Sequence, residues 1–410
     1  MTDRVRVLVY GGIAAEACPF YRRGIFLSHL ANLGVDLIPW TPPLTHPQAY
    51  AGRWVDAIRD GVARVDYREL ANANIVLFSR WSNTFPACTA CGAECGSLEG
   101  LESHNRDTRH GTLSWDPLLR LLLPALLADA SLRSRCAVMY DLDDDLFHQP
   151  EWVGHGPGLA RALDLVELLI RAADLVTVST PVLERLLQPL TARIHVIRNA
   201  IDPDLYRTDV AAAPAGDDPG DDPRVTRVLF YGADVRRRDY AVCKAAVDKA
   251  ARARRRTRRI WLGSDSPAVR ALVDEALPKV ETGAPFGAAL ANLHPHVGLA
   301  PLEPGPFASA KSELHWLEYA MVGAATVASR LPTAGPYDVI EDGRDGLLAA
   351  GAADWRRAVM RLVSSTDLRT EIAGRARERV LAEYQAAERA ENWAAAYRWA
   401  ANHPGIGPRL

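Results

Sequence analysis

The stretch FASAKSELHWLEYAMVGAATVASRLPTAGPYDVIEDGRDGLL, residues 307–348, is predicted to form a loop, a helix, a buried strand and a second loop. Lys311, His315 and Glu318 follow one another at i, i+4 and i+7, so we expect them on one face of the helix. Residues 325–328 are small or β-branched, as in a short buried strand. The apolar residues expected on the inward face of the helix are Leu314, Leu317, Ala320, Met321 and Ala324.

The polar face of this helix suits a nucleotide diphosphate. A helix N-terminus carries free N–H groups and a partial positive charge, which favour phosphate. Lys311 in the first turn adds a full charge, and Glu318 two turns later can accept hydrogen bonds from two sugar hydroxyls. Diphosphate at one end and ribose at the other is therefore the predicted ligand. Taken alone, the helix also fits an ordinary amphipathic segment with a solvated charged face.

The same stretch resembles the donor-binding segment of GT-B glycosyltransferases, in particular those grouped as glycosyltransferase family 4. In these enzymes it commonly reads K-S-x-x-K-x-L-E-Y-A, then a strand of small residues, P-Y and I-x-D-G-x-x-G-L-L. Ala310 stands where many members carry a glutamate eight residues before the ribose-binding one. The resemblance is strongest over residues 225–350. The matching residues are Lys311-Ser312, Leu317-Glu318-Tyr319-Ala320, Pro336-Tyr337, Ile340-Glu341-Asp342-Gly343 and Gly346-Leu347-Leu348.

The resemblance implies an α/β chain with the GT-B fold, in which two Rossmann-like domains face each other across a cleft. Its C-terminal helix crosses back to the N-terminal domain, where Trp393 and Tyr397 are expected to anchor it. The expected divisions are an acceptor-side domain at 1–208 with a cysteine-containing insertion at about 82–115, a flexible Asp-, Pro- and Gly-rich linker at 209–223, a donor domain at 224–385 and a returning helix at 386–410.

Three consecutive arginines, residues 236–238, follow a predicted strand that ends at Gly232. Arginine binds phosphate oxygens through two parallel hydrogen bonds. The family motif at this place is G-R-x-x-x-x-K-G, with Ala233 here at the arginine position and Arg238 at the lysine position. We expect one or two of these arginines to bind the donor diphosphate; a solvated basic run is the alternative.

By the same resemblance, the chain is expected to move a sugar from a nucleotide-diphosphate donor, UDP- or GDP-linked, to a small soluble metabolite. Most enzymes with this segment retain the anomeric configuration, so retention is expected. Basic side chains and a helix dipole neutralise the leaving diphosphate, so no metal or other cofactor is expected. The expected catalytic residues are Lys311, Arg237 and Arg238, and the expected donor-binding residues are Gly232, Arg236, Gly263, Ser312, His315, Glu318, Gly12 and Arg22.

Bulk composition agrees with a soluble enzyme. The chain has 410 residues, 48% hydrophobic and 24% charged, which is enough for two domains with cores of their own. A formal net charge of -2 does not indicate a nucleic-acid partner. No signal peptide or membrane-spanning run is evident, so a cytoplasmic location is expected. The abundance of Ala and Arg suggests a bacterial source. The oligomeric state is left open.

The first half begins like a doubly wound domain, with a strand at 5–10, a helix at 21–33 and a second strand at 35–39. Gly12 lies in the first glycine turn, although the G-x-G-x-x-G fingerprint is absent. Arg22 belongs to a P-x-x-Y-R pattern seen in some family members, which places it near the acceptor or the donor phosphates. A solvated helix position for Arg22 is the alternative.

A cysteine-rich loop follows, with the pattern Cys88-x-x-Cys91-x-x-x-Cys95 and two histidines downstream at 104 and 110. Three thiolates and a histidine can hold zinc in a tetrahedral structural site. The zinc pattern is incomplete, because a second Cys-x-x-Cys pair is missing. Free thiols or a disulfide are the main alternative, and redox or cluster chemistry is a third.

Clustered carboxylates follow the strand at 137–142, in the run Asp141-Leu-Asp143-Asp144-Asp145. The run resembles a D-x-D-D-x-L-F segment of some GT-B enzymes, which implies a polar loop facing the cleft. A solvated turn and a metal site, as in the D-x-D motif of GT-A enzymes, are the alternatives. Two other functions thus stay open: a metal-dependent sugar-nucleotide enzyme that uses these aspartates, and a non-catalytic nucleotide- or partner-binding protein.

Overall fold

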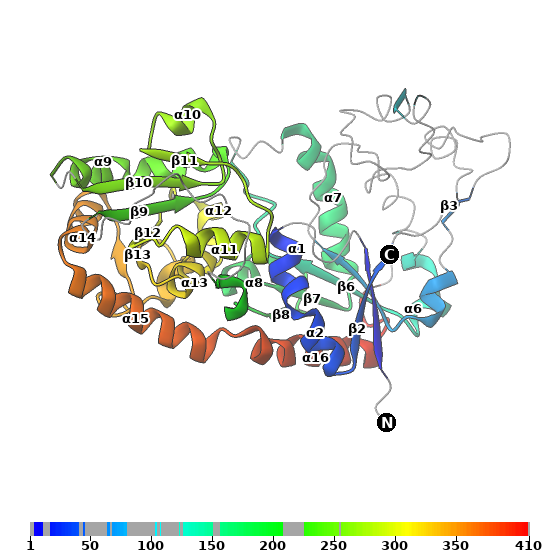
Figure 1. Ribbon diagram of the computed structural model, residues 1–410. Helices are drawn as coiled ribbons and strands as arrows, with labels where there is room; N and C mark the ends of the chain where they lie inside the picture. The colour runs from blue at the N-terminus through cyan, green and yellow to red at the C-terminus, as the bar shows by residue number, and fades with distance from the viewer. Residues whose placement is uncertain are drawn as a thin grey trace.

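The computed structural model describes residues 4–10, 17–40, 44–45, 64–65, 68–79, 103–104, 107, 123, 126–150, 156–207, 225–253 and 256–408. These residues form two six-stranded sheets with helices around them (Figure 1). All strand pairs within the two large sheets are parallel. Strands such as VGLA and ATVAS are buried along their whole length because helices cover both faces of such a sheet.

The first sheet is built in the order β2-β1-β5-β6-β7-β8. Every residue of β6 is buried, so this strand lies at the centre of the domain. The elements of this half are β1 (Val5–Tyr10), α1 (Ala17–Arg22), the 3-10 helix η1 (Gly24–Phe26), α2 (Leu27–Asn32), β2 (Val35–Trp40), the antiparallel pair β3 (Leu44–Thr45) and β4 (Arg64–Val65), η3 (Arg68–Asn72), β5 (Ile75–Ser79), α6 (Ala130–Arg133), β6 (Ala137–Leu142), α7 (Gly156–Ala172), β7 (Leu175–Val178), α8 (Pro181–Leu187), β8 (Ile194–Val196) and η5 (Pro203–Tyr206).

The second sheet has the order β11-β10-β9-β12-β13-β14. The chain builds outward from β9 to β11 and then returns to the other side of β9 with β12, so strand order reverses between β9 and β12. Its elements are β9 (Thr226–Tyr231), η6 (Asp234–Arg236), α9 (Arg237–Ala253), β10 (Thr257–Leu262), α10 (Pro267–Arg270), β11 (Glu275–Leu277), α11 (Ala284–Asn292), β12 (Val297–Ala300), α12 (Pro306–Ser309), α13 (Leu314–Met321), β13 (Ala325–Ser329), η7 (Pro336–Val339), β14 (Leu347–Ala349), α14 (Ala352–Ser364), α15 (Thr366–Glu383) and α16 (Ala386–Asn402).

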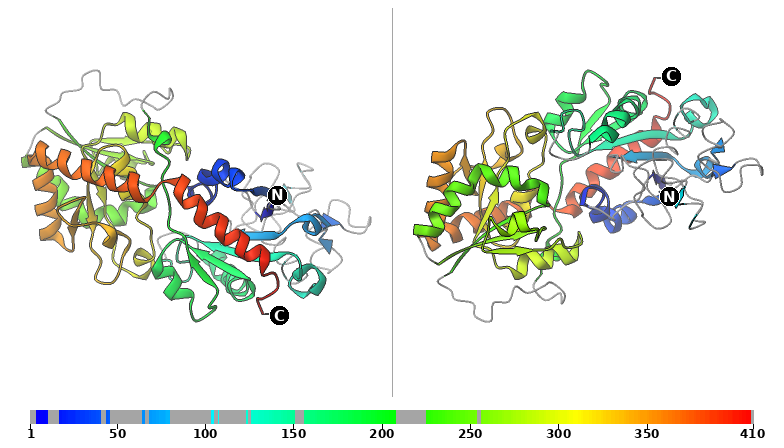
Figure 2. Two further views of the ribbon diagram at one scale, coloured as in Figure 1. Left: turned by 90° about the horizontal axis from the view of Figure 1, so that it is seen from below. Right: turned by 90° about the horizontal axis from the view of Figure 1, so that it is seen from above.

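The last two helices join the domains. Helix α15 packs on the second domain, and α16 crosses to the first, as Figure 2 shows from below. Trp393 and Tyr397 of α16 are fully buried in one apolar cluster with residues of β1, β5 and β6. The predicted return of the C-terminal helix, with these two residues as its anchors, is therefore confirmed.

Two predicted helices differ from those in the structure. The helix expected at 21–33 is broken at Arg23 because the side chains of Arg22 and Arg23 both turn inward to the buried Asp141. The helix expected to carry Lys311 is also two pieces, α12 and α13. Residues 310–313 between them contact the first domain, so Lys311 does not share a helix face with His315 and Glu318.

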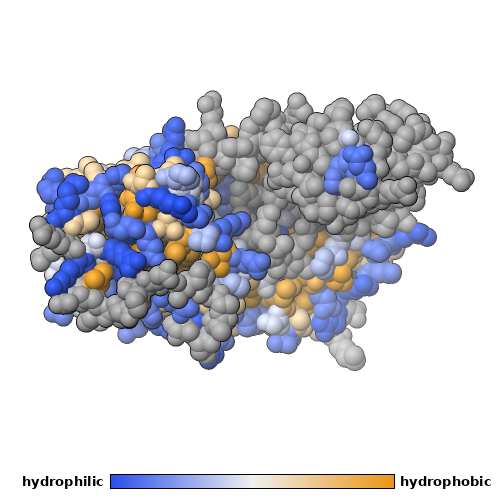
Figure 3. Space-filling view, turned by 45° about the horizontal axis from the view of Figure 1, so that its top comes forward, coloured by the Kyte–Doolittle hydropathy of each residue, from blue (hydrophilic) through white to orange (hydrophobic). Residues whose placement is uncertain are grey.

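The described surface is mainly hydrophilic on the face shown in Figure 3, with apolar residues in separate patches. Large apolar side chains that stay exposed in the described ranges are Leu27, Trp399 and Ile406. None of the helices that the structure describes combines the length and the apolarity needed to cross a membrane.

Trp393 is expected to carry much of the contact between α16 and the first domain. We predict that Trp393→Ala costs about 3–5 kcal/mol in urea unfolding, because a cavity replaces a buried indole that also stacks on Tyr397. Trp399→Ala, on the same helix but 39% exposed, is the matched control and should cost far less. Equal losses in the two variants would contradict this account.

Candidate active site

A pocket of about 640 Å³ lies between the two domains, at the carboxyl ends of β9 and β12. Ligands of open α/β sheets bind outside the carboxyl ends of the strands, where strand order reverses. The second domain provides most of the wall, and the loop after β6 in the first domain provides the rest. The lining residues are His148, Pro150, Arg236, Arg238, Asp239, Leu302, Glu303, Pro304, Gly305, Pro306, Phe307, Ala308 and Lys311.

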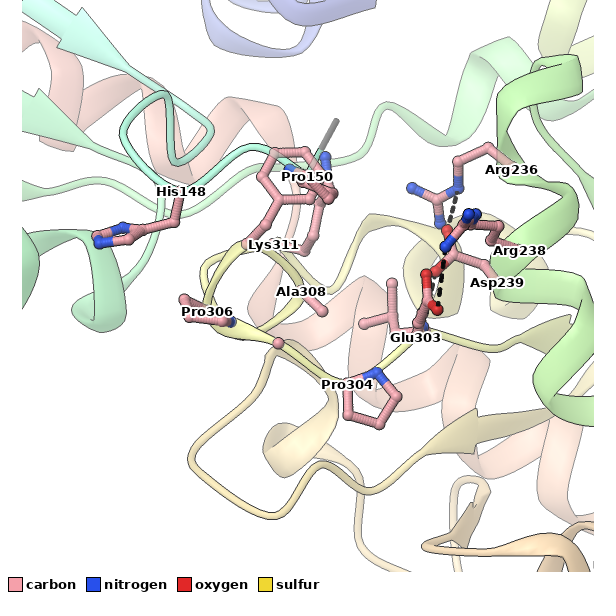
Figure 4. A pocket seen from close by; sticks show the side chains of 13 residues that line it. His148, Pro150, Arg236, Arg238, Asp239, Glu303, Pro304, Pro306, Ala308 and Lys311 are labelled. Carbon is pink, nitrogen blue, oxygen red and sulfur yellow. Dashed lines mark hydrogen bonds and ion pairs between the residues drawn. The ribbon is translucent and has the colours of Figure 1, made fainter. Parts of the chain in front are cut away.

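Two arginines line one end of the pocket (Figure 4). Arg236 Nε lies 2.8 Å from Asp239 Oδ2, and Arg238 lies 3.8 Å from Glu303. Asp239 is buried and also accepts a hydrogen bond from the backbone N–H of Glu303 at 2.7 Å. Asp239 therefore holds the Arg236 guanidinium in place at the pocket wall. The Arg238 side chain is 60% exposed, and its pairing with Glu303 is looser.

Arg237 does not line the pocket. Its guanidinium is 45% exposed and pairs with Asp234 at 3.0 Å on the surface. Because consecutive residues at the start of α9 point in different directions, the run 236–238 splits into two lining arginines and one surface arginine. Arg237 was predicted to be catalytic, but its side chain is not among those that line the pocket.

Lys311 projects from the loop between α12 and α13. Its ammonium lies 2.8 Å from both carboxylate oxygens of Asp144 and 4.1 Å from the ring centroid of Phe307. Asp144 belongs to the first domain, so this ion pair joins the domains across the pocket. Lys311 is thus brought together with Arg236 and Arg238, although it stands before the helix rather than in its first turn.

The residues on either side of Lys311 also reach the first domain. Ala310 is buried in the apolar cluster of that domain, and its carbonyl accepts a hydrogen bond from Thr180 at 3.2 Å. Ser312 accepts one from Asn199 at 2.9 Å. Glu313 is fully buried 3.2 Å from Arg198, and burial raises the pKa of its carboxyl. The four residues 310–313 therefore form one interdomain bridge.

Glu318 is buried at the contact between the domains. Its Oε1 accepts hydrogen bonds from the hydroxyls of Tyr21 and, at 3.3 Å, Tyr206, and its Oε2 accepts one from Tyr231. These tyrosines come from α1, η5 and the end of β9, so three distant segments meet at one carboxyl. Burial raises the pKa of Glu318 to about 8, against the lowering effect of the hydroxyls of Tyr21 and Tyr206.

His315 packs beside this cluster. Its ring lies 4.1 Å from that of Tyr231, centroid to centroid, and its Nδ1 has no hydrogen-bond partner among the residues that the structure describes. Burial lowers the pKa of the imidazole well below its usual value, and the nearby Arg236 and Lys311 lower it further. The lowered pKa favours the neutral imidazole, and His315 is not among the residues that line the pocket.

Gly232 and Gly263 end the adjacent strands β9 and β10. Gly232 has φ +147°, and a Cβ there would meet the side chain of Arg236 at 3.0 Å. Gly263 has φ +115°, and a Cβ there would lie 2.8 Å from the carbonyl oxygen of Gly232. Both glycines let the strand ends approach each other and the pocket arginine closely. Whether they contact a donor remains a prediction.

Arg22 does not reach the pocket, contrary to expectation. Its guanidinium is 2% exposed, lies 2.7 Å from Asp141, and donates to the carbonyl of Ile197. It also lies 4.7 Å from the ring centroid of Trp393. Arg22 is therefore a packing and charge-pairing residue of the first domain, because its side chain turns inward at the end of α1 to the buried Asp141.

The acidic run after β6 is not a solvated turn. Asp141 is 2% exposed and pairs with Arg22, with Arg23 at 3.5 Å, and with the hydroxyl of Thr177 at 2.7 Å. Asp144 pairs with Lys311, so the run faces the other domain as a polar loop. Within the described ranges, no three His, Cys, Asp or Glu side chains gather closely enough to share a metal ion. Gly12, Cys88, Cys91 and Cys95 lie outside the described residues.

Sequence reasoning missed several groups at this site. Asp239 had a local signal, since it stands three residues after Arg236 on a helix. Glu313 had none, because its partner Arg198 is 115 residues away in the sequence. The tyrosines around Glu318 likewise meet only through the tertiary structure.

Comparisons with known proteins agree with this geometry. Residues 237–395 match the family model described as glycosyl transferase-like. A search of curated proteins finds no significant match to the sequence.

Three solved structures share the fold over nearly the whole chain. Sucrose-phosphate synthase from Thermosynechococcus elongatus has 15% identity and a TM-score of 0.59, with 97% of this chain and 99% of that chain covered. The catalytic domain of starch synthase IV from Arabidopsis thaliana, bound to ADP and acarbose, has 10% identity and a TM-score of 0.60, with 98% and 100% covered. HepE from Anabaena, in complex with UDP and glucose, has 12% identity and a TM-score of 0.53, with 97% and 100% covered. The predicted GT-B fold is confirmed, and the matched domain confirms the predicted glycosyltransferase class.

The buried carboxyl of Glu318 predicts a pH-dependent stability. Its pKa is about 8 in the folded chain, against 4.5 for an ordinary glutamate, so the folded chain holds an extra proton between these values. The contribution of Glu318 to the free energy of unfolding therefore falls as pH rises from about 4.5 to 8. We expect the melting temperature of Glu318→Gln to fall less between pH 5.5 and 8 than that of the wild type. The exposed control Glu388→Gln should keep the wild-type slope, and a Glu318→Gln slope equal to wild type would contradict the assignment.

Proposed function

We propose that this glycosyltransferase binds a nucleotide-diphosphate sugar in the pocket between its domains and transfers the sugar to a small soluble acceptor. The observation that carries the proposal is the convergence of Arg236, Arg238 and Lys311 on one pocket at the point where strand order reverses in the second sheet. Three cations from two separate segments can donate hydrogen bonds to the oxygens of a diphosphate, and such a crevice is where nucleotide ligands of α/β sheets are bound.

The chemical demand of this transfer is the charge that develops on the leaving diphosphate. Guanidinium groups bind phosphate oxygens through paired hydrogen bonds, and an ammonium group adds a point charge. Arg236 is held by Asp239 and Lys311 by Asp144, so both cations stand ready before the donor arrives. Such preorganised charge stabilises a transition state without the cost of reorganising solvent.

We assign the nucleoside end of the donor to the region of Glu318. Its carboxyl oxygens would accept hydrogen bonds from the ribose hydroxyls, in exchange for at least one of the tyrosine hydroxyls that now donate to them. Tyr21 comes from the first domain, so this exchange would couple donor binding to a small movement between domains. The solved complexes of HepE with UDP and of starch synthase IV with ADP favour uracil and adenine as the bases to test first, with guanine as the third.

We further propose that donor binding needs no metal ion and that the anomeric configuration is retained. The cations already present supply the neutralising charge. Two aspartates of the run after β6 are committed to basic side chains, Asp141 to Arg22 and Asp144 to Lys311. Because these two carboxylates are already paired, a metal-independent mechanism is favoured over one in which the aspartates bind a cation. Retention rests on the resemblance of the donor segment alone.

The first test is calorimetric binding of UDP, ADP and GDP, with and without EDTA. We expect one nucleotide to bind equally well in EDTA. Arg236→Ala and Lys311→Ala should each weaken it about tenfold or more, because each loses a charge-assisted hydrogen bond. Arg237→Ala is the matched control, since it removes the same charge one residue away from the pocket. The proposal fails if no nucleotide binds, or if Arg237→Ala weakens binding as much as Arg236→Ala.

The ribose assignment has a separate test. Glu318→Ala should weaken nucleotide binding about fivefold, which corresponds to one good hydrogen bond. The same variant should bind inorganic pyrophosphate like the wild type, because pyrophosphate lacks ribose. Parallel loss of both ligands would show that Glu318 supports the fold of the pocket rather than the nucleoside.

A further inference from the structure

One carboxylate in the pocket wall keeps its hydrogen-bonding capacity unused. The described residues that line the pocket include two carboxylates, those of Asp239 and Glu303. Asp239 is committed, because its Oδ2 lies 2.8 Å from Arg236 and its Oδ1 accepts a hydrogen bond from the backbone N–H of Glu303 at 2.7 Å. Glu303 Oε1 lies 3.8 Å from Arg238, which is beyond hydrogen-bond distance, and Glu303 Oε2 is buried with no hydrogen-bond partner among the described residues.

The backbone that carries Glu303 is fixed, although its carboxylate is not. Its N–H is held by the buried Asp239, and Pro304, whose ring restricts the backbone, follows it. In Figure 4 the Glu303 carboxylate points toward Arg236 and Arg238 from the wall that the second domain provides. A buried acceptor without a donor is unfavourable, and rotation of the carboxylate can bring either oxygen to the pocket. Glu303 is thus placed to accept hydrogen bonds from a ligand bound beside the arginines.

The pocket has room for more than a diphosphate. With the nucleoside end at Glu318, which is not among the lining residues, the volume of about 640 Å³ is left to the diphosphate and the sugar. Guanidinium and ammonium groups donate hydrogen bonds and accept none, whereas sugar hydroxyls also need acceptors. Ala310 stands where many related enzymes carry a glutamate, and its side chain is buried in the apolar cluster of the first domain. That position therefore brings no carboxylate into the pocket.

We propose that Glu303 accepts hydrogen bonds from hydroxyls of the donor sugar and thereby selects a neutral sugar over a uronic acid. The inference rests on the proposed function, since it takes the diphosphate to lie at Arg236, Arg238 and Lys311. The sugar is bonded to the diphosphate, so it lies next to these cations, where Glu303 also stands. Once the diphosphate engages Arg238, the Glu303 carboxylate is left to the sugar hydroxyls. Hydrogen bonds to an ionised acceptor are roughly twice as strong as those to a neutral one.

A sugar that carries its own carboxylate would meet Glu303 as a like charge. Like charges at contact distance repel, and the repulsion is larger at a half-buried site than in open water. A neutral hexose or N-acetylhexosamine instead offers several hydroxyl donors. The specificity therefore combines attraction to one class of donor with repulsion of the other.

The test uses the full chain and calorimetry with UDP, ADP and GDP and with the glucose, galactose, mannose and N-acetylglucosamine derivatives of each. The measured quantity is the Kd of the tightest sugar donor divided by the Kd of its free nucleotide, because the contributions of base and diphosphate largely cancel in this ratio. We expect Glu303→Ala to raise the ratio about tenfold, through loss of a charge-assisted hydrogen bond. Glu303→Gln should raise it about threefold, since the amide oxygen still accepts a neutral hydrogen bond.

Uronates give a second readout. The wild type should bind the donor oxidised to a carboxylate at C6, such as UDP-glucuronate in place of UDP-glucose, at least about tenfold more weakly. Glu303→Gln should narrow this difference at least about threefold, because it removes the like charge. Equal affinity of the wild type for the neutral and the oxidised donor would overturn the inference, as would a wild type that binds a nucleotide but none of the neutral sugar donors.

Glu371→Gln is the matched control, because it removes the same charge from an exposed pair with Arg375 in the second domain, outside the pocket. It should leave the ratio unchanged. The inference is also overturned if Glu303→Ala changes the two Kd values by the same factor, since Glu303 would then only position Arg238. Failure of the wild type to bind any nucleotide would instead remove the proposed function itself.

Discussion

The bridge formed by residues 310–313 is the contact on which the rest of this structure depends. It leaves the second domain after α12, places Ala310 in the apolar cluster of the first domain, and pairs Lys311 with Asp144 and Glu313 with Arg198. An isolated buried charge is strongly unfavourable, so Glu313 cannot stay in this position without its partner in the other domain. The wall of the pocket is therefore positioned by both halves of the chain together.

Buried ionic contacts at this boundary specify geometry more than they add stability. The desolvation of a carboxylate and a guanidinium offsets most of their attraction, so pairs such as Arg22–Asp141 contribute little net free energy. They do exclude alternative packings, because any shift leaves a charge unpaired in the interior. The favourable free energy of the domain contact comes instead from apolar surface that α16 buries on the first sheet around Trp393.

The acidic run after β6 shows how adjacent carboxylates acquire different tasks. Asp141 lies in a fully buried strand and pairs with both arginines at the break in the first helix. Asp144 reaches across to Lys311, and Asp145 folds back on its own loop to hold His148. One residue type, aspartate, thus contributes to the core, to the domain contact and to the pocket. The direction in which each successive aspartate points determines which of these it contacts. A comparable division separates Arg236, which lines the pocket, from Arg237, which faces solvent.

The class of fold could be predicted from the amino-acid sequence alone, and the sequence also singled out the segment that carries Lys311 and Glu318. Apolar runs such as VRVLVY and VGLA define buried parallel strands, and the order of strands and helices leaves a doubly wound domain in each half. Local patterns also identified Arg236, Lys311 and Glu318 as residues of interest. The surroundings of these residues are set by tertiary contacts. Lys311 lies outside the helix, and Glu318 accepts hydrogen bonds from three tyrosine hydroxyls. Arg22 is buried in the core. The physical reason is that periodicity reports which face of an element is buried, whereas a partner such as Arg198 for Glu313, 115 residues away, is fixed only when the two domains meet.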